Sequence, residues 1–222
     1  MPLIDLKELT QNIRKIAAHW GAVNAATPTR PLTIPASSAL LGGLTLAELT
    51  MLEGAISADF TAVVGADNAT QGAQARRNSA RTALLVTYKL FRKTTLAYLG
   101  ESVYATQLPT LPSVGANDKL FEDTGDDLAH IWSAIDADAS LSLTRPLTLS
   151  EGTDLTEFQS ALASVKAANA ALPGAKEHAR QVRATRDEKV KRAIAALRAY
   201  RKLAQVHLPP GHPLLATIPT LD

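Results

Sequence analysis

Apolar residues recur at spacings of three and four along most of the chain, which is the period of a helix with one buried face. The first such run spans residues 5–23, and its apolar face is Leu6, Leu9, Ile13, Ile16 and Trp20. No segment has the alternating pattern of a convincing strand. The pattern therefore predicts an all-α fold.

Two longer helices are predicted after a Pro- and Thr-rich connector at residues 27–44. One spans residues 45–64, and its apolar face is Leu46, Leu49, Leu52 (or Met51), Ile56, Phe60 and Val63. The other spans residues 71–99, and its apolar positions are Leu84, Leu85, Tyr88, Phe91 and Leu96. Because Val64-Gly65 indicates a turn between them, the two helices are predicted to form an antiparallel hairpin with the first helix packed across it.

The second half of the chain has the same organisation. Helices are predicted near residues 124–137, 155–171 and 175–206. Pro173-Gly174 marks a turn between the last two, at the place where Val64-Gly65 stands in the first half.

This organisation reflects an internal duplication. Thr29-Arg30-Pro31-Leu32-Thr33 recurs as Thr144-Arg145-Pro146-Leu147-Thr148, 115 residues further on, and the helical pattern before it recurs at the same offset. After the motif the offset falls to 109, so the first copy holds six extra residues within 34–44. Further matching segments follow in the same order in both halves of the chain. Their common order excludes the explanation that the repeated pentamer is a chance match.

Three of these matching segments are specific. Thr45-Leu46-Ala47-Glu48 corresponds to Asp154-Leu155-Thr156-Glu157, and both are capping boxes that begin a helix. Phe91-Arg92-Lys93 corresponds to Tyr200-Arg201-Lys202, and Leu108-Pro109-Thr110-Leu111 to Ile218-Pro219-Thr220-Leu221. We therefore predict a first helical repeat at 1–112, a linker at 113–119 and a second repeat at 120–222. Each repeat is a three-helix unit, and a pseudo-twofold axis relates the two as one six-helix bundle or a pair of bundles.

Composition narrows the class further. The chain has 222 residues, of which 46% are hydrophobic and 5% aromatic, a balance that suits closely packed helices. It has no cysteine, which excludes disulfides and thiolate metal sites. The first residues lack a basic segment followed by an apolar run, and the longest aliphatic stretches are shorter than the roughly 20 residues that span a bilayer. The expectation is a cytoplasmic protein without a membrane partner.

The net charge of +2 conceals a strong segregation of charge. Residues 71–99 hold six basic and no acidic residues, and residues 176–202 hold ten basic and three acidic ones. These cations either face the acidic helices and solvent or form a surface for a polyanion or an acidic partner. The candidate anion- or partner-binding residues are Arg180, Arg183, Lys191, Arg198, Arg201, Lys202, Arg76, Arg81, Lys89, Arg92 and Lys93.

A helical projection of residues 176–202 supports a basic stripe only in part. Seven cations fall within about 100° of one another: Lys176, Arg180, Arg183, Lys191, Arg198, Arg201 and Lys202. Asp187, Val190 and Ile194 lie in or beside the same sector, so part of the stripe must contact a core or another chain. No RNA-binding motif, zinc-finger spacing or aromatic platform accompanies it, so nucleic-acid binding is possible but not favoured.

Motifs for catalysis, cofactors and metals are missing from the sequence. There is no phosphate-binding glycine loop, no nucleophile elbow and no Glu-x-x-His pair for a di-iron site. The acidic cluster at residues 122–127 is interpreted as the start of a helix, with Asp123 or Thr124 as its cap. A weak contact with a divalent ion or with a basic partner is the alternative. Arg30 and Arg145 are expected to tie the connectors to helix carbonyls or to a carboxylate, and paired anion sites are the alternative.

The leading prediction is a non-enzymatic helical interaction or assembly protein that self-associates, with no cofactor and no metal. Exposed-looking aliphatic residues in the connector and tail could dock on a neighbour or pack on their own bundle: Leu40, Leu41, Leu214 and Leu215. The second hypothesis is a nucleic-acid or polyanion binder that uses the two basic helices. An enzyme with a site between the copies is a third, for which no residues can be named.

Overall fold

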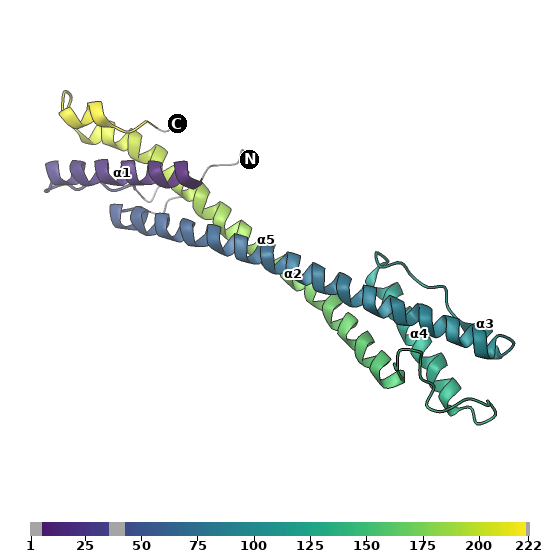
Figure 1. Ribbon diagram of the computed structural model, residues 1–222. Helices are drawn as coiled ribbons and strands as arrows, with labels where there is room; N and C mark the ends of the chain where they lie inside the picture. Colours follow the sequence, from purple (N-terminus) through teal and green to yellow (C-terminus); the bar gives the residue numbers. More distant parts are fainter. Residues whose placement is uncertain (1–5, 36–42, 221–222) are drawn as a thin grey trace. The chain divides into compact units, whose positions relative to one another are not determined.

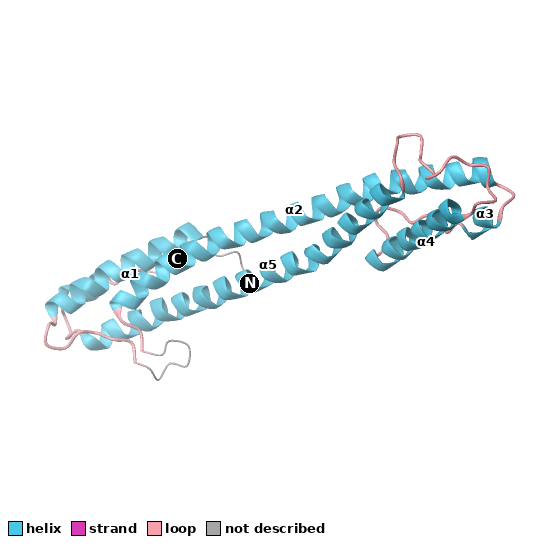
Figure 2. Ribbon diagram, turned by 90° about the horizontal axis from the view of Figure 1, so that it is seen from below, coloured by secondary structure: helices cyan, strands magenta, loops and turns pink. Residues whose placement is uncertain are grey.

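The fold is all-α, as predicted. A computed structural model describes residues 6–35 and 43–220. Its helices are α1 (Leu6–Ala26), α2 (Leu46–Leu99), α3 (Val103–Gln107), α4 (Asp118–Ala137) and α5 (Leu155–His207), followed by the 3-10 helix η1 (Pro213–Thr217). Figure 1 and Figure 2 show these elements, with helices and loops only along the described part of the chain. Within that part, the β-structure is one isolated antiparallel bridge between Ile34 and Leu44.

The predicted helical hairpins are wrong, because each predicted pair is one continuous helix. α2 has 54 residues and runs through Val64-Gly65, and α5 has 53 residues and contains Pro173. Gly65 and Gly174 lie inside these helices without a positive φ; among described glycines only Gly43, Gly152 and Gly211 have one. The described residues therefore form five α-helices, not six.

The chain divides into two compact units. Unit 1 comprises residues 1–66 and 178–222, and unit 2 comprises residues 67–177. Each long helix contributes to both units. The helix before each Thr-Arg-Pro-Leu-Thr motif, α1 in unit 1 and α4 in unit 2, packs on parts of both α2 and α5.

In unit 1, the apolar face of α1 packs on α2 and α5 as the periodicity predicts. The ring of Trp20 stacks on that of Tyr200, with centroids 5.0 Å apart. Burial raises the pKa of Tyr200, so its hydroxyl keeps its proton and donates to His19 Nδ1 at 2.6 Å. His19 Nε2 then donates to the Leu214 carbonyl at 2.9 Å. This bond ties the C-terminal segment to α1, where Leu214 and Leu215 pack against the core of unit 1. Leu40 and Leu41 lie outside the described residues.

In unit 2, a cluster of aromatic rings joins α2, α4 and α5, and Figure 2 shows α4 beside these helices. Trp132 stacks on Phe91 at 4.7 Å and packs against Phe158 at 5.5 Å. Trp132 and Phe91 thus repeat in unit 2 the contact that Trp20 and Tyr200 make in unit 1. Phe91 and Tyr200 are 109 residues apart, which is the offset of the predicted repeat.

α4 begins earlier than predicted, at Asp118. Its N-cap is Asn117, whose side chain accepts a hydrogen bond from the Leu120 N–H at 2.7 Å. The assignment of Asp123 or Thr124 as a cap is therefore wrong, and the acidic cluster lies within the helix. The other two predicted caps are present: Thr45 Oγ1 accepts from the Glu48 N–H, and Asp154 accepts from the Glu157 N–H.

Substitution of Gly125 by alanine is expected to lower the free energy of unfolding by about 1–3 kcal/mol. An added Cβ would overlap the Tyr88 hydroxyl and lie 2.5 Å from Leu162 Cδ1. The hydroxyl cannot move away freely, because it donates to the Phe121 carbonyl at 3.1 Å. Urea titration of the variant measures the loss. Gly54→Ala is the control, since open space surrounds that glycine, and alanine there should stabilise the helix slightly.

Substitution of Thr95 by valine is expected to raise the free energy of unfolding by about 1 kcal/mol. Thr95 is 1% exposed, and its hydroxyl has no hydrogen-bond partner among the described residues. Valine keeps the shape and the low helix propensity of threonine, so the variant isolates the hydroxyl. Ala204, which stands 109 residues after Thr95, is fully buried without a hydroxyl. A lower urea midpoint for the variant would contradict this account.

Candidate functional sites

Arg81 is not part of an anion-binding surface, because it is fully buried in unit 2. Its guanidinium donates to the Asp118 carboxylate, to Asn169 Oδ1 at 3.1 Å, and to the carbonyls of Val114 and Ala116 at 3.1 and 2.7 Å. Burial lowers the pKa of Arg81, and the neighbouring Asp118 opposes that effect. This network joins α2, α4, α5 and the linker, and it uses four of the donors of Arg81 internally.

The other candidate cations on α2 differ in whether they are bonded within the fold or exposed to solvent. Arg92 donates to the Pro109 carbonyl, which ties the segment after α3 to α2. Arg76, Lys89 and Lys93 are exposed. Lys89 and Lys93 are four residues apart and share a helix face, which Arg76 does not.

The α5 candidates lie in unit 1. Lys191, Arg198 and Lys202 are exposed and fall on one face, and no described residue pairs with any of them. Arg180 and Arg183 are exposed but have interactions of their own. Arg201 is partly buried, and its Nε has no described partner. The two groups of cations belong to different units, so each is considered by itself.

The duplicated motif is held in the same way in both units. In unit 1 the Trp20 indole donates to the Leu32 carbonyl, and Asn24 Oδ1 accepts from the Leu32 N–H. In unit 2 Trp132 and Asp136 make the corresponding bonds with Leu147. Each motif leucine is thus fixed by an indole and by an Asn or Asp near the end of the preceding helix.

The two motif arginines differ. Arg145 donates to the carbonyl of Asp138, the C-cap residue of α4, and to that of Leu141 in the connector. The connector is thus tied to the end of α4 and to itself, not to carbonyls within a helix. Arg30 is exposed, and its printed hydrogen bond is from its backbone N–H to the Thr27 carbonyl at 3.0 Å; its side chain lines a groove instead.

Each motif lines a surface groove together with the last turns of a long helix. The groove in unit 2 has a volume of about 360 Å³ and is lined by Thr94, Tyr98, Ser142, Leu143, Thr144, Pro146, Leu147 and Thr148. The groove in unit 1 has a volume of about 280 Å³ and is lined by Arg30, Pro31, Leu32, Thr33, Pro35, Leu203, Val206 and His207. At the offset of 109, Thr94 corresponds to Leu203 and Tyr98 to His207. The two grooves therefore occupy equivalent positions.

The side chains that stand out at these grooves are apolar and exposed. Tyr98 is 71% exposed and Val206 is 85% exposed, the two highest values among the large apolar residues that the structure describes. Neither residue was a candidate from the sequence. No sequence signal singles them out, because residues 94–98 and 203–207 have no residue in common at the offset of 109.

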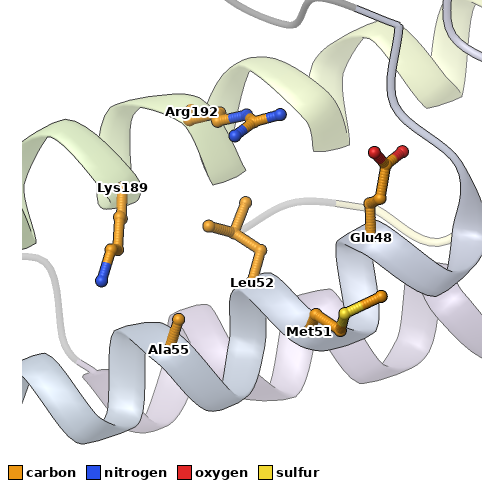
Figure 3. Close-up of a pocket in the computed structure, with 6 residues that line it drawn as sticks. All are labelled: Glu48, Met51, Leu52, Ala55, Lys189 and Arg192. Carbon is orange, nitrogen blue, oxygen red and sulfur yellow. The ribbon is translucent and has the colours of Figure 1, made fainter.

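A third groove, of about 300 Å³, lies in unit 1 between α2 and α5 (Figure 3). Leu52 points toward α5, and Lys189 and Arg192 come from α5 itself. These cations have nearby acids: Lys189 pairs with Asp59 at 2.8 Å. Hydrogen bonds from the Thr45 N–H and hydroxyl lower the pKa of Glu48, with a smaller effect from the charge of Arg192. The groove is therefore locally neutralised and is a poor anion site.

The two units carry opposite net charge. Unit 1 has 13 basic and 8 acidic residues, a net charge of +5, whereas unit 2 has 10 basic and 13 acidic residues, a net charge of −3. Three of the unit 2 acids lie on exposed positions of α4: Asp123, Asp126 and Asp127.

Comparisons with known proteins add no family. No protein-family model matches the chain, and neither a curated protein nor a solved structure matches it. Among the described residues, no group of three or more His, Cys, Asp or Glu side chains could hold a metal ion. By length and composition alone α2 is apolar enough to cross a membrane, a property that core helices of soluble proteins share. The molecule is thus defined by its fold: an all-helical chain in which two compact units present matching grooves.

Proposed function

We propose that this protein is a non-enzymatic helical assembly protein that self-associates. The observation that supports this most directly is the pair of equivalent grooves, each beside one of the two most exposed large apolar side chains. Exposed apolar groups beside a preformed groove are typical of protein–protein contacts. Two such positions in one chain allow it to contact more than one neighbour.

The proposal includes the duplication. Copies at 1–112 and 120–222 account for the matching leucine clamps, the matching aromatic stacks and the matching grooves. A pseudo-twofold relation between the copies is the simplest origin of a chain with two similar docking positions.

Polyanion binding is the second candidate, and the unpaired cations on α5 favour it. Lys191, Arg198 and Lys202 form a row along one exposed helix face. Such a row attracts phosphates, and its binding would weaken steeply with salt because bound counterions are released.

Light scattering after size exclusion tests the proposal. The mass should exceed the monomer mass of 23.5 kDa and should rise with protein concentration. Samples at roughly 50 mM and 500 mM salt, each with and without a mixed-sequence oligonucleotide, separate the two candidates. A mass above that of the monomer that does not change when the oligonucleotide is added supports assembly. A monomer that binds the oligonucleotide only at low salt supports the second candidate, and a monomer under every condition contradicts assembly.

A further inference from the structure

One face of α5 in unit 1 combines two cations with an exposed apolar residue. Arg198, Lys202 and Val206 follow one another at intervals of four residues, so they lie within about 80° on the helix. All three are exposed, and Val206 is 85% exposed. No described acid pairs with Arg198 or Lys202.

One face of α4 in unit 2 combines two acidic residues with an exposed apolar residue, so its charges are opposite to those of the α5 face. Leu120 is 50% exposed, and Asp123 and Asp127 follow it three and seven residues later, within about 60° of the helix. Asp127 is exposed and has no described partner. Asp123 pairs with Lys119 at 2.9 Å, but both side chains are more than half exposed. A solvent-exposed pair of that kind contributes little to stability, so Asp123 can exchange its partner at little cost.

The spacings along the two faces match when the helices run antiparallel. With a rise of about 1.5 Å per residue, Lys202 and Arg198 lie about 6 and 12 Å from Val206 along α5. Asp123 and Asp127 lie about 4.5 and 10.5 Å from Leu120 along α4. If Leu120 meets Val206, then Asp123 faces Lys202 and Asp127 faces Arg198. The offsets of about 1.5 Å are within the reach of these side chains.

We infer that α4 of one chain docks antiparallel on α5 of a second copy of this chain, with Leu120 on Val206, Asp123 on Lys202 and Asp127 on Arg198. The inference rests on the proposed self-association and names its surfaces. Net charges of +5 on unit 1 and −3 on unit 2 steer the units of different chains toward each other. Because the two surfaces differ, the contact is heterologous, and each chain can act as donor and acceptor at once.

Charge reversal tests the contact. The first variant combines Arg198→Glu with Lys202→Glu, and the second combines Asp123→Lys with Asp127→Lys. Each alone should weaken self-association at least about tenfold, because like charges then face each other. An equal mixture of the two variants should associate again. A single chain with all four substitutions should also associate, which excludes misfolding as the cause of the loss.

The control combines Lys89→Glu with Lys93→Glu, which reverses two exposed charges on α2 and should leave self-association unchanged. Sedimentation across a concentration series measures each variant, with the helix content checked by circular dichroism. If every variant self-associates as strongly as the natural chain, this contact is overturned and the proposed function stays intact. A natural chain that stays monomeric at every concentration would overturn both. Loss of oligonucleotide binding in the first variant, without a change in mass, would assign the α5 face to nucleic acid and overturn the contact as well.

Discussion

Replacement of Arg81 by methionine is expected to lower the free energy of unfolding by about 3–5 kcal/mol. Arg81 is fully buried, and its guanidinium is bonded to Asp118, Asn169 and the carbonyls of Val114 and Ala116. Methionine fills a similar length but removes the donor from these oxygens. Asn169 is buried and loses its bond to Arg81, whereas the Asp118 carboxylate is 43% exposed and keeps Arg77 as a partner. Urea titration followed by circular dichroism measures the loss.

Two further variants separate charge from geometry. Arg81→Lys keeps the charge but cannot reproduce the planar fork, so it should lose less stability than methionine and still lie below the natural chain. Arg77→Met removes a guanidinium that shares Asp118 and Asn169 with Arg81, but its side chain is 16% exposed. Water can replace part of its role, so this loss should be the smallest of the three. A loss below about 1 kcal/mol in Arg81→Met would contradict a structural role for the network.

Replacement of Trp132 by alanine is expected to cost about 3–5 kcal/mol as well, because a large buried side chain leaves a cavity. Trp132 is fully buried, stacks on Phe91, and donates to the Leu147 carbonyl at 3.2 Å. The variant also releases one of the two bonds that hold the motif in unit 2. The loss is measured by urea titration with circular dichroism.

Trp132→Phe is the matched control. Phenylalanine keeps an aromatic ring against Phe91 but cannot donate to Leu147, so the loss should be clearly smaller than with alanine. In both variants Trp20 is the remaining tryptophan, so fluorescence reports on unit 1 while circular dichroism reports on the whole chain. An alanine variant as stable as the phenylalanine variant would show that the ring contributes little.

Local signals in the sequence predicted local structure well. The caps at Thr45 and Asp154 need only residues three positions away, and both are present. The apolar face of α1 was predicted because its period of three to four residues is long and regular. Of the two alternatives at the next helix, Leu52 is buried at 8% exposure and Met51 is 66% exposed.

Signals that compete with tertiary packing were misleading. Pro173 removes one backbone hydrogen bond and disfavours a helix by about 3 kcal/mol, yet α5 continues through it. Leu172 beside it is buried, and packing of this kind outweighs the local preference for a turn. At Val64-Gly65 the glycine has ordinary helical backbone and simply weakens the helix.

The role of Arg81 could not be predicted, because its partners lie 33 to 88 residues away in the sequence. A basic run on a helix has the same pattern whether its members face solvent or a buried carboxylate. The grooves were out of reach for the same reason, since each combines a connector with a helix that the periodicity alone does not bring together.

Each of the two cores takes residues from both sides of the linker at residues 113–119. This division determines what a proteolytic cut in the linker would produce. Each half of such a cut chain would carry one helix with a clamped tryptophan in its second half, and one long helix whose aromatic partner belongs to the other half of the chain. Neither half could complete a core alone, but the two could recombine without a covalent link.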